Sequence, residues 1–192
     1  MANINIINTE LIGKVDPDKF LYAGLGMNVI PFTGPQLTVG YNMKAFCAEL
    51  TFTYGFNKTD DVYFYGMGAS IQSAFKYQAL RAALRLGYAL PLSRQVLLTP
   101  QAGVAYNYIY GKEIDGVTAT NSDFMKSFNT CSAILGAKLT FNFSGHLGLC
   151  VTPEYDFAIA KEDNYDIVKA SNNKIKGWTE GFGLSVELMY KF

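Results

Sequence analysis

The chain has 192 residues, of which 49% are hydrophobic and 15% aromatic, so it can bury the core of one folded domain. Its 16 basic residues balance 16 acidic residues, and without a net charge to attract nucleic acid, nucleic-acid binding is not expected. No apolar run approaches the roughly 18 to 20 residues of a membrane-spanning helix. The charged fraction is 17%, which is low for a water-soluble domain and requires an explanation.

Residues 1–19 fit no strand pattern, and we expect them to be a tail or the remnant of a linker. The first ten residues, MANINIINTE, have neither the basic segment nor the continuous apolar segment of a secretory signal peptide. The protein is therefore expected to be either cytosolic or a form from which a signal peptide is absent. The rest of the chain, 20–192, is expected to form one domain.

From residue 20 onward, large apolar residues alternate with small or polar residues, which is typical of β-strands with two different faces. Two weaker segments come first, at 20–30 and 36–43, and a stronger one follows at 45–56. The remaining predicted strands are 78–92, 95–110, 129–143, 146–160 and 178–192. The sequence therefore predicts eight strands.

The connections between these strands alternate in length. Tight turns are predicted around 42–44, 91–94 and 144–146. Long polar loops are predicted at 57–70, 111–126 and 161–177. This alternation indicates an antiparallel up-and-down arrangement whose two ends face different surroundings, as in outer-membrane barrels with short periplasmic turns and longer extracellular loops.

The two strand faces differ in a way that decides which one points outward. Nearly all strand glycines lie on the polar face, and most large aromatic residues lie on the other face. A soluble lipocalin-like barrel would bury its apolar face and cover its outside with charges. An eight-stranded barrel is barely wide enough inside for side chains, so the glycine face fits the interior and the bulky face fits lipid.

The same face carries charged residues of both signs, which predicts a lumen plugged by ion pairs that does not conduct. These residues are Glu49, Arg81, Arg85, Lys138, Glu154, Asp156 and Glu187. Their positions along the strands predict a first layer of Glu49, Arg85, Lys138 and Glu187 and a second layer of Arg81, Glu154 and Asp156. Because they lie on neighbouring strands, Glu49 is expected to contact Arg85, and Lys138 is expected near Glu154.

The last predicted strand ends FGLSVELMYKF, alternating to a final Phe. It resembles the C-terminal assembly signal of bacterial outer-membrane barrels, and the chain is closest in size to the small OmpA/OmpX-type barrels. The resemblance implies an all-β, eight-stranded antiparallel transmembrane β-barrel over 20–192 in a Gram-negative outer membrane. It also implies outer-membrane lipid and the barrel assembly machinery as partners. Tyr190 and Phe192 are expected to face lipid at one membrane interface and Trp178 near the other.

Nothing in the sequence predicts catalysis, a cofactor or a metal site. The single histidine, His146, lies at a predicted turn without a recognisable Ser/His trio. Glu154 and Asp156 could form a general acid/base pair, but interior ion pairing explains them better because Arg and Lys share their face. The segment 161–166 is rich in oxygen ligands without the spacing of a calcium loop. The cysteines lack a CxxC motif; they are Cys47, Cys131 and Cys150.

The favoured function is a non-enzymatic outer-membrane protein with a structural, adhesive or surface-interaction role. Its unknown surface partner would bind the loops at 57–70, 111–126 and 161–177, because loops carry function on rigid scaffolds. Tyr63, Phe64 and Tyr65 would either contact that partner or extend a hairpin beyond the membrane. The alternatives are a conduit for small solutes or hydrophobic ligands and, third, a lipid-modifying enzyme.

Overall fold

A computed structural model describes residues 19–30, 33–55, 62–65, 71–113, 127–162 and 178–192. Residues 1–18 of the expected tail over 1–19, and most of the three expected long loops, lie outside these residues. Among the described residues, no helix is long and apolar enough to cross a membrane.

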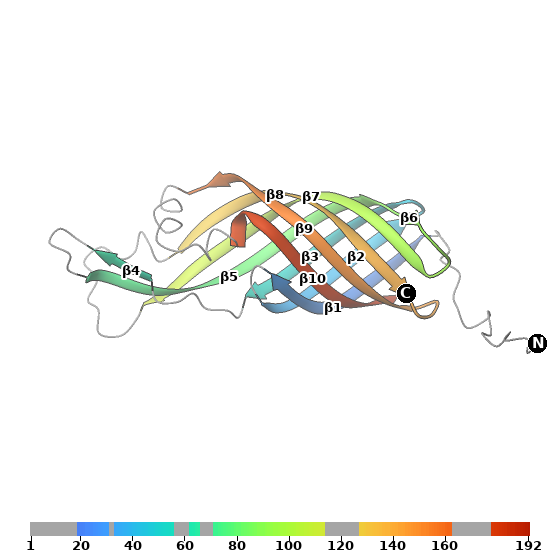
Figure 1. Cartoon of the computed structure of the whole chain (residues 1–192), viewed down its shortest axis with the longest axis horizontal. Helices are drawn as coiled ribbons and strands as arrows, with labels where there is room; N and C mark the ends of the chain where they lie inside the picture. Colours follow the sequence, from blue (N-terminus) through green and yellow to red (C-terminus); the bar gives the residue numbers. More distant parts are fainter. Residues whose placement is uncertain (1–18, 31–32, 56–61, 66–70, 114–126, 163–177) are drawn as a thin grey trace, which may run out of the picture.

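The described residues form a single antiparallel sheet of ten strands, eight of which close into a barrel (Figure 1). In barrel order these eight are β1 (Phe20–Ile30), β2 (Gly34–Met43), β3 (Phe46–Gly55), β5 (Ile71–Tyr88), β7 (Val96–Glu113), β8 (Ser127–Asn142), β9 (Leu147–Lys161) and β10 (Gly181–Lys191). β10 pairs with β1, for example Leu188 with Leu25, and this pairing closes the barrel. The predicted fold class, an eight-stranded antiparallel transmembrane barrel, is confirmed.

Two further strands are short. One lies within the predicted strand 78–92, and the other forms the hairpin that was one of the two alternatives for Tyr63, Phe64 and Tyr65. β6 (Leu90–Pro91) follows directly after β5 and pairs with the start of β7. β4 (Val62–Tyr65) lies inside the segment expected to be a loop and pairs with the first residues of β5. Tyr63, Phe64 and Tyr65 therefore belong to a hairpin, which projects beyond the barrel rim at the left of Figure 1.

The barrel has two distinct ends. The tight turns lie at the same end as the C-terminus, at the right of Figure 1, and we call this the turn end. The backbone N–H of Phe192 donates to the carbonyl of Leu21 there, so the last strand finishes beside the start of the first. The opposite end carries the β4–β5 hairpin, and we call it the loop end.

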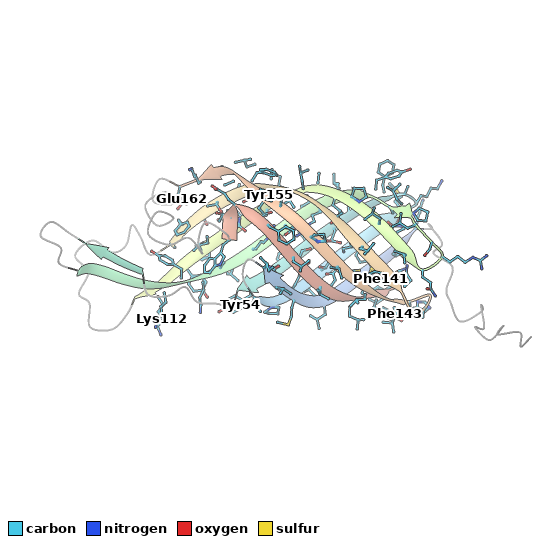
Figure 2. The ribbon with its side chains drawn as sticks, viewed as in Figure 1. Tyr54, Lys112, Phe141, Phe143, Tyr155 and Glu162 are labelled. Carbon is cyan, nitrogen blue, oxygen red and sulfur yellow. The ribbon has the colours of Figure 1, made fainter. Side chains whose placement is uncertain are left out.

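Side chains alternate between the outer and inner faces of the strands as the sequence pattern predicts. Large aliphatic and aromatic side chains project from the outer wall (Figure 2), and Leu25, Leu86 and Ile159 are among the most exposed. Buried Thr, Asn, Gln and charged side chains line the interior. A Cβ on Gly103 would lie 2.1 Å from the Leu84 carbonyl oxygen of the neighbouring strand β5, so glycine is needed where these two backbones approach closely.

Candidate functional site: a charged network inside the barrel

Seven charged side chains from five strands form one network in the barrel interior. β3 supplies Glu49, β5 supplies Arg81 and Arg85, β8 supplies Lys138, β9 supplies Glu154 and Asp156, and β10 supplies Glu187. Six of these residues are buried, and the side chain of Glu154 is 11% exposed. Charges removed from water in this way are costly unless each one is paired and hydrogen-bonded.

Nearer the turn end, Lys138 lies between two glutamates. Its Nζ contacts Oε2 of Glu49 and lies 2.7 Å from Oε1 of Glu187. The hydroxyl of Tyr22 also donates to Oε2 of Glu49, over 2.9 Å. One ammonium group therefore joins β3, β8 and β10, which are not neighbours in the sheet.

Neutral donors complete the coordination of Glu187. Thr38 Oγ1 donates to Glu187 Oε2 over 2.7 Å, and Gln36 Nε2 donates to the same oxygen over 3.2 Å. Both donors come from β2, which lies two strands away from β10 in the sheet. Neutral donors are needed because the network contains four carboxylates and three cations.

Nearer the loop end, Arg81 binds two acids of β9. Its Nη2 lies 3.0 Å from Glu154 Oε1 and 3.0 Å from Asp156 Oδ1, and its Nη1 donates to Asp156 Oδ2. The planar guanidinium suits this double contact, because its N–H groups match the two oxygens of a carboxylate.

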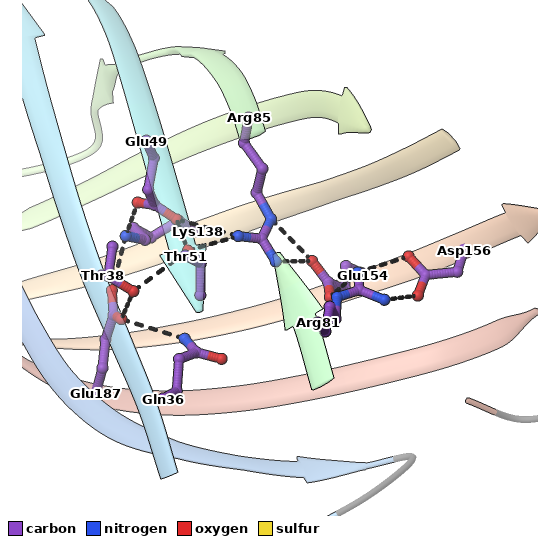
Figure 3. Close-up of polar contacts among 10 residues, drawn as sticks. All are labelled: Gln36, Thr38, Glu49, Thr51, Arg81, Arg85, Lys138, Glu154, Asp156 and Glu187. Atoms are coloured by element: carbon purple, nitrogen blue, oxygen red, sulfur yellow. Dashed lines mark hydrogen bonds and ion pairs between the residues drawn. The ribbon is translucent and has the colours of Figure 1, made fainter. Parts of the chain in front are cut away.

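Arg85 connects the two groups (Figure 3). Its Nη2 lies 2.7 Å from Glu154 Oε2, and its Nη1 lies 3.5 Å from Glu49 Oε1 and 2.8 Å from Thr51 Oγ1. The two predicted layers are thus one continuous network across the lumen. The expected contact of Lys138 with Glu154 is wrong, because Gly136 is the residue opposite Glu154 and Lys138 lies two residues nearer the turn end.

An apolar cluster on the inner face, nearer the loop end, was missed from the sequence. Tyr77, Ile109 and Phe128 are fully buried, and the rings of Tyr77 and Phe128 lie 6.0 Å apart between centroids. Ile109 is the register partner of Phe128 on the neighbouring strand. Their position in the alternation could have revealed them, since each shares the face that carries the glycines and charges.

Trp178 does not face lipid, contrary to the sequence prediction. Its side chain is only 2% exposed, and it lies with Thr179 in a helical turn before β10 begins at Gly181. The neighbouring Thr179 carbonyl accepts a hydrogen bond from Ser132 Oγ over 2.9 Å, which holds the turn against the barrel wall. Gly181 has φ of 131°, a conformation that ends the alternation assumed from the sequence.

Tyr190 and Phe192 lie on the outer wall at the turn end, where they are 46% and 67% exposed. His146 is in the adjacent turn, with its ring stacked on Tyr190 at 5.8 Å and its Nδ1 3.0 Å from the Lys191 carbonyl oxygen. These contacts place the histidine against the last strand and away from the carboxylates of the network.

The arrangement of the carboxylates favours ion pairing over acid–base chemistry. Glu154 and Asp156 are both held by Arg81, and Glu154 also by Arg85. In the part of the chain that the structure describes, no cluster of three or more His, Cys, Asp or Glu is placed to hold a metal ion. Most of the oxygen-rich segment 161–166 lies outside that part. The network connects opposite walls of the barrel through the ion pairs of Arg85 and Lys138.

A sequence model of the autotransporter beta-domain matches residues 34–181. The chain belongs to this family. In the curated proteins, no sequence matches it. Among solved structures, the beta-domain is similar to a major outer membrane protein from Thermus thermophilus, with 17% identity, 91% of this chain and 98% of that chain covered, and a TM-score of 0.62.

Two further structures have the same architecture. The N-terminal β-barrel domain of Pseudomonas aeruginosa OprF shares 11% identity over 91% of this chain and 100% of that chain, with a TM-score of 0.55. The attachment invasion locus protein Ail of Yersinia pestis shares 13% identity over 91% and 97%, with a TM-score of 0.52. These likenesses concern the fold, and they confirm the predicted resemblance to small bacterial outer-membrane barrels.

Proposed function

We propose that this beta-domain is a non-enzymatic outer-membrane protein that displays a surface at its loop end for an unknown partner. The observation that carries the proposal is the charged network, whose ion pairs join side chains from opposite walls of the interior. A barrel filled in this way is a rigid membrane-embedded scaffold. Recognition is then left to the part of the molecule that projects from the membrane.

The hairpin of β4 and β5 supports this proposal. β5 extends to Ile71, well beyond the end of β3 at Gly55, and β4 pairs with this extension. Among the described residues, β4 lies at the edge of the sheet, with β5 as its partner. An edge strand presents backbone N–H and C=O groups to which an extended segment of another protein can pair. Ail, which has the same fold, is named an attachment invasion locus protein.

The remaining parts of the proposal concern assembly. Tyr190 and Phe192 would anchor the turn end at the membrane interface, and the C-terminal strand would be the segment that the barrel assembly machinery binds. Residues 1–19 would be a tail or the remnant of a linker, and 20–192 the transmembrane barrel. Bacterial outer-membrane localisation follows from the family and the fold, and the presence of a signal peptide in a precursor remains part of the proposal.

Trimming the loop end tests the surface role. The refolded barrel, in lipid nanodiscs, is screened against a glycan array and in pull-downs from host and bacterial surface extracts. The screen is repeated with 57–70, 111–126 and 161–177 shortened, and with a control that carries Gly145→Ala in a turn-end loop. We expect ligands of the intact barrel to be lost only on trimming. Binding that survives trimming, or lipid hydrolysis or acyl transfer by the purified barrel, would contradict the proposal.

Single-channel recording separates the scaffold from the alternative of a solute conduit. We expect no steady conductance of porin size from the intact protein in planar bilayers, because Arg85 and Lys138 join opposite walls of the lumen. A steady open level of that size would favour the conduit. The matched variant replaces Arg81, Arg85, Glu154 and Asp156 by Ser, and this barrel is expected to conduct more than the native one.

A further inference from the structure

The outer wall of β5 and β7 carries a second arrangement of residues that the charged network does not explain. Proceeding toward the loop end, the register pairs on this face are Ala82 with Tyr106, Leu80 with Tyr108, Gln78 with Tyr110, and Lys76 with Lys112. The wall therefore changes from aliphatic and aromatic to amide and hydroxyl, and then to two ammonium groups.

A groove of about 460 Å³ lies on the apolar part of this wall. Its lining includes Leu37, Phe52, Leu80, Ala82, Tyr106 and Tyr108. Ala82 is the register partner of both Phe52 and Tyr106, so the smallest side chain of the row lies between two aromatic rings. This difference in size leaves a hollow that can hold aliphatic chains.

A hydrogen-bonded cluster lies at the loop-end side of the groove. The hydroxyl of Tyr110 donates to Gln78 Oε1 over 2.5 Å, and the Tyr54 hydroxyl lies 3.2 Å from the same oxygen. The ring of Tyr110 is stacked on that of Tyr108 at 5.9 Å, which fixes its position. Aromatic rings with polar tips are typical of the level at which lipid headgroups meet the acyl chains.

Lys76 and Lys112 lie one register pair beyond this cluster, roughly 7 Å further along the strands. Residues directly opposite on one face of an antiparallel pair have Cβ atoms roughly 5 Å apart, so the two side chains can reach the same anion. Figure 2 shows Lys112 nearer the loop end than Tyr54. Two neighbouring cations just beyond the aromatic level match the position of a lipid phosphate.

We propose that this face is a binding site for a phosphate-bearing lipid of the loop-end leaflet, with its acyl chain in the groove and its phosphate between Lys76 and Lys112. A second copy of the chain fits less well. A two-fold dimer through this face with its axis along the membrane normal would place both lysine pairs at the same height and close together. The lipid, in contrast, matches the face in both hydrophobicity and charge.

Native mass spectrometry of the full chain, refolded in detergent, tests the site. The probes are dioleoyl phosphatidic acid and dioleoyl phosphatidylcholine, which have identical chains. We expect one molecule of phosphatidic acid to bind about 25-fold more tightly than phosphatidylcholine, since each of the two lysines near an anionic headgroup contributes roughly a fivefold gain. Inorganic phosphate at millimolar concentration is expected not to displace the lipid.

Two pairs of variants locate the site. The double variant Lys76→Ala with Lys112→Ala is expected to lose the preference for phosphatidic acid, while Lys161→Ala, an exposed lysine at the loop end of β9, keeps it. Ala82→Leu fills the groove and should weaken the binding of both lipids. Ala102→Leu, on the same face nearer the turn end, should leave the binding of both lipids unchanged. Should the alanine pair fail to fold, Lys76→Gln with Lys112→Gln replaces it, and the unheated gel shift of folded barrels checks each protein.

Four results would overturn the proposal. The first is equal binding of the two lipids by the native protein. The second is a preference for phosphatidic acid that persists without the lysine pair. The third is displacement of the lipid by inorganic phosphate alone. The fourth is a dimer that excludes lipid and cross-links through Ala82→Cys.

Discussion

Arg85 and Glu154 contact each other across the lumen, with Nη2 of Arg85 2.7 Å and Nε 3.0 Å from Oε2 of Glu154. The two residues come from β5 and β9, which are not neighbours in the sheet. Their contact therefore connects opposite walls of the barrel, and it also joins the Lys138 group to the Arg81 group.

Arg85→Ala is expected to destabilise the barrel by about 3 to 5 kcal/mol, because it leaves Glu154 and Glu49 buried with fewer cations. Replacing both partners, as in Arg85→Met with Glu154→Gln, should cost less than the single change. Urea unfolding in lipid vesicles, followed by the gel shift of unheated samples, measures both. Arg94→Ala at an exposed turn is the control. Equal stabilities of Arg85→Ala and the control would show that the network contributes nothing.

Lys138→Met should destabilise the barrel, because Glu187 then keeps only the neutral donors Thr38 and Gln36. The change leaves a buried carboxylate without its cation, so we expect a loss of about 3 to 5 kcal/mol in unfolding free energy. Adding Glu187→Gln should recover part of this loss, because the uncompensated charge is then absent. Urea unfolding in lipid vesicles compares the native protein, the single variant and the double variant. Equal stabilities of Lys138→Met and the double variant would rule the idea out.

Gly40→Ala tests the close packing of the interior. A Cβ at this position would lie 2.1 Å from Cζ and 2.3 Å from the hydroxyl oxygen of Tyr22. The phenol must move, and its hydrogen bond to Glu49 is lost, so we expect a loss of about 1 to 3 kcal/mol in unfolding free energy. Gly145→Ala is the matched control, because nothing lies within 4 Å of its Cβ position. A Gly40→Ala barrel as stable as this control would mean that Tyr22 has room to move.

Trp178 is the only tryptophan of the chain, so its fluorescence reports one position. Because its side chain is buried, brominated acyl chains in the surrounding bilayer should quench it weakly. A Trp178→Phe protein that also carries Tyr190→Trp places the indole on the outer wall and should be quenched strongly. Strong quenching of the native protein would restore the lipid-facing position expected from the sequence.

The sequence was sufficient to predict the barrel fold and most of the charged residues that line its interior. The two-residue period defined the strands, and the shared face of glycines and charges identified Glu49, Arg85 and Glu187 as inward residues, where the structure places them. Contacts across the lumen were less predictable. Lys138 reaches Glu49 on a distant strand, which depends on the stagger of the strands and on the length of the lysine side chain.

Other features of the structure could not be predicted from the two-residue period alone. Trp178 fits the period of the last strand, but the conformation of Gly181 turns the backbone before that strand begins. β4 lies in the segment 57–70, which was expected to be a loop. The sequence left its aromatic residues either as a partner contact or as a hairpin, and the pairing of β4 with β5 shows the hairpin. Tyr77 and Phe128 lie one residue before the predicted strands 78–92 and 129–143, whereas β5 and β8 begin earlier, at Ile71 and Ser127.

The pairing of β1 with β10 has a consequence for the order of events during folding. The first and last strands are synthesised far apart in time, and Glu187 meets Lys138, Thr38 and Gln36 only after the last strand is in place. A slip of β10 by two residues would keep every side chain on its proper face, yet it would carry the Glu187 carboxylate roughly 7 Å along the barrel. The backbone hydrogen bonds of the sheet could form in the shifted register, but the ion pair between Lys138 and Glu187 could not. The charged side chains therefore favour one register of β10 over the registers that are shifted by two residues.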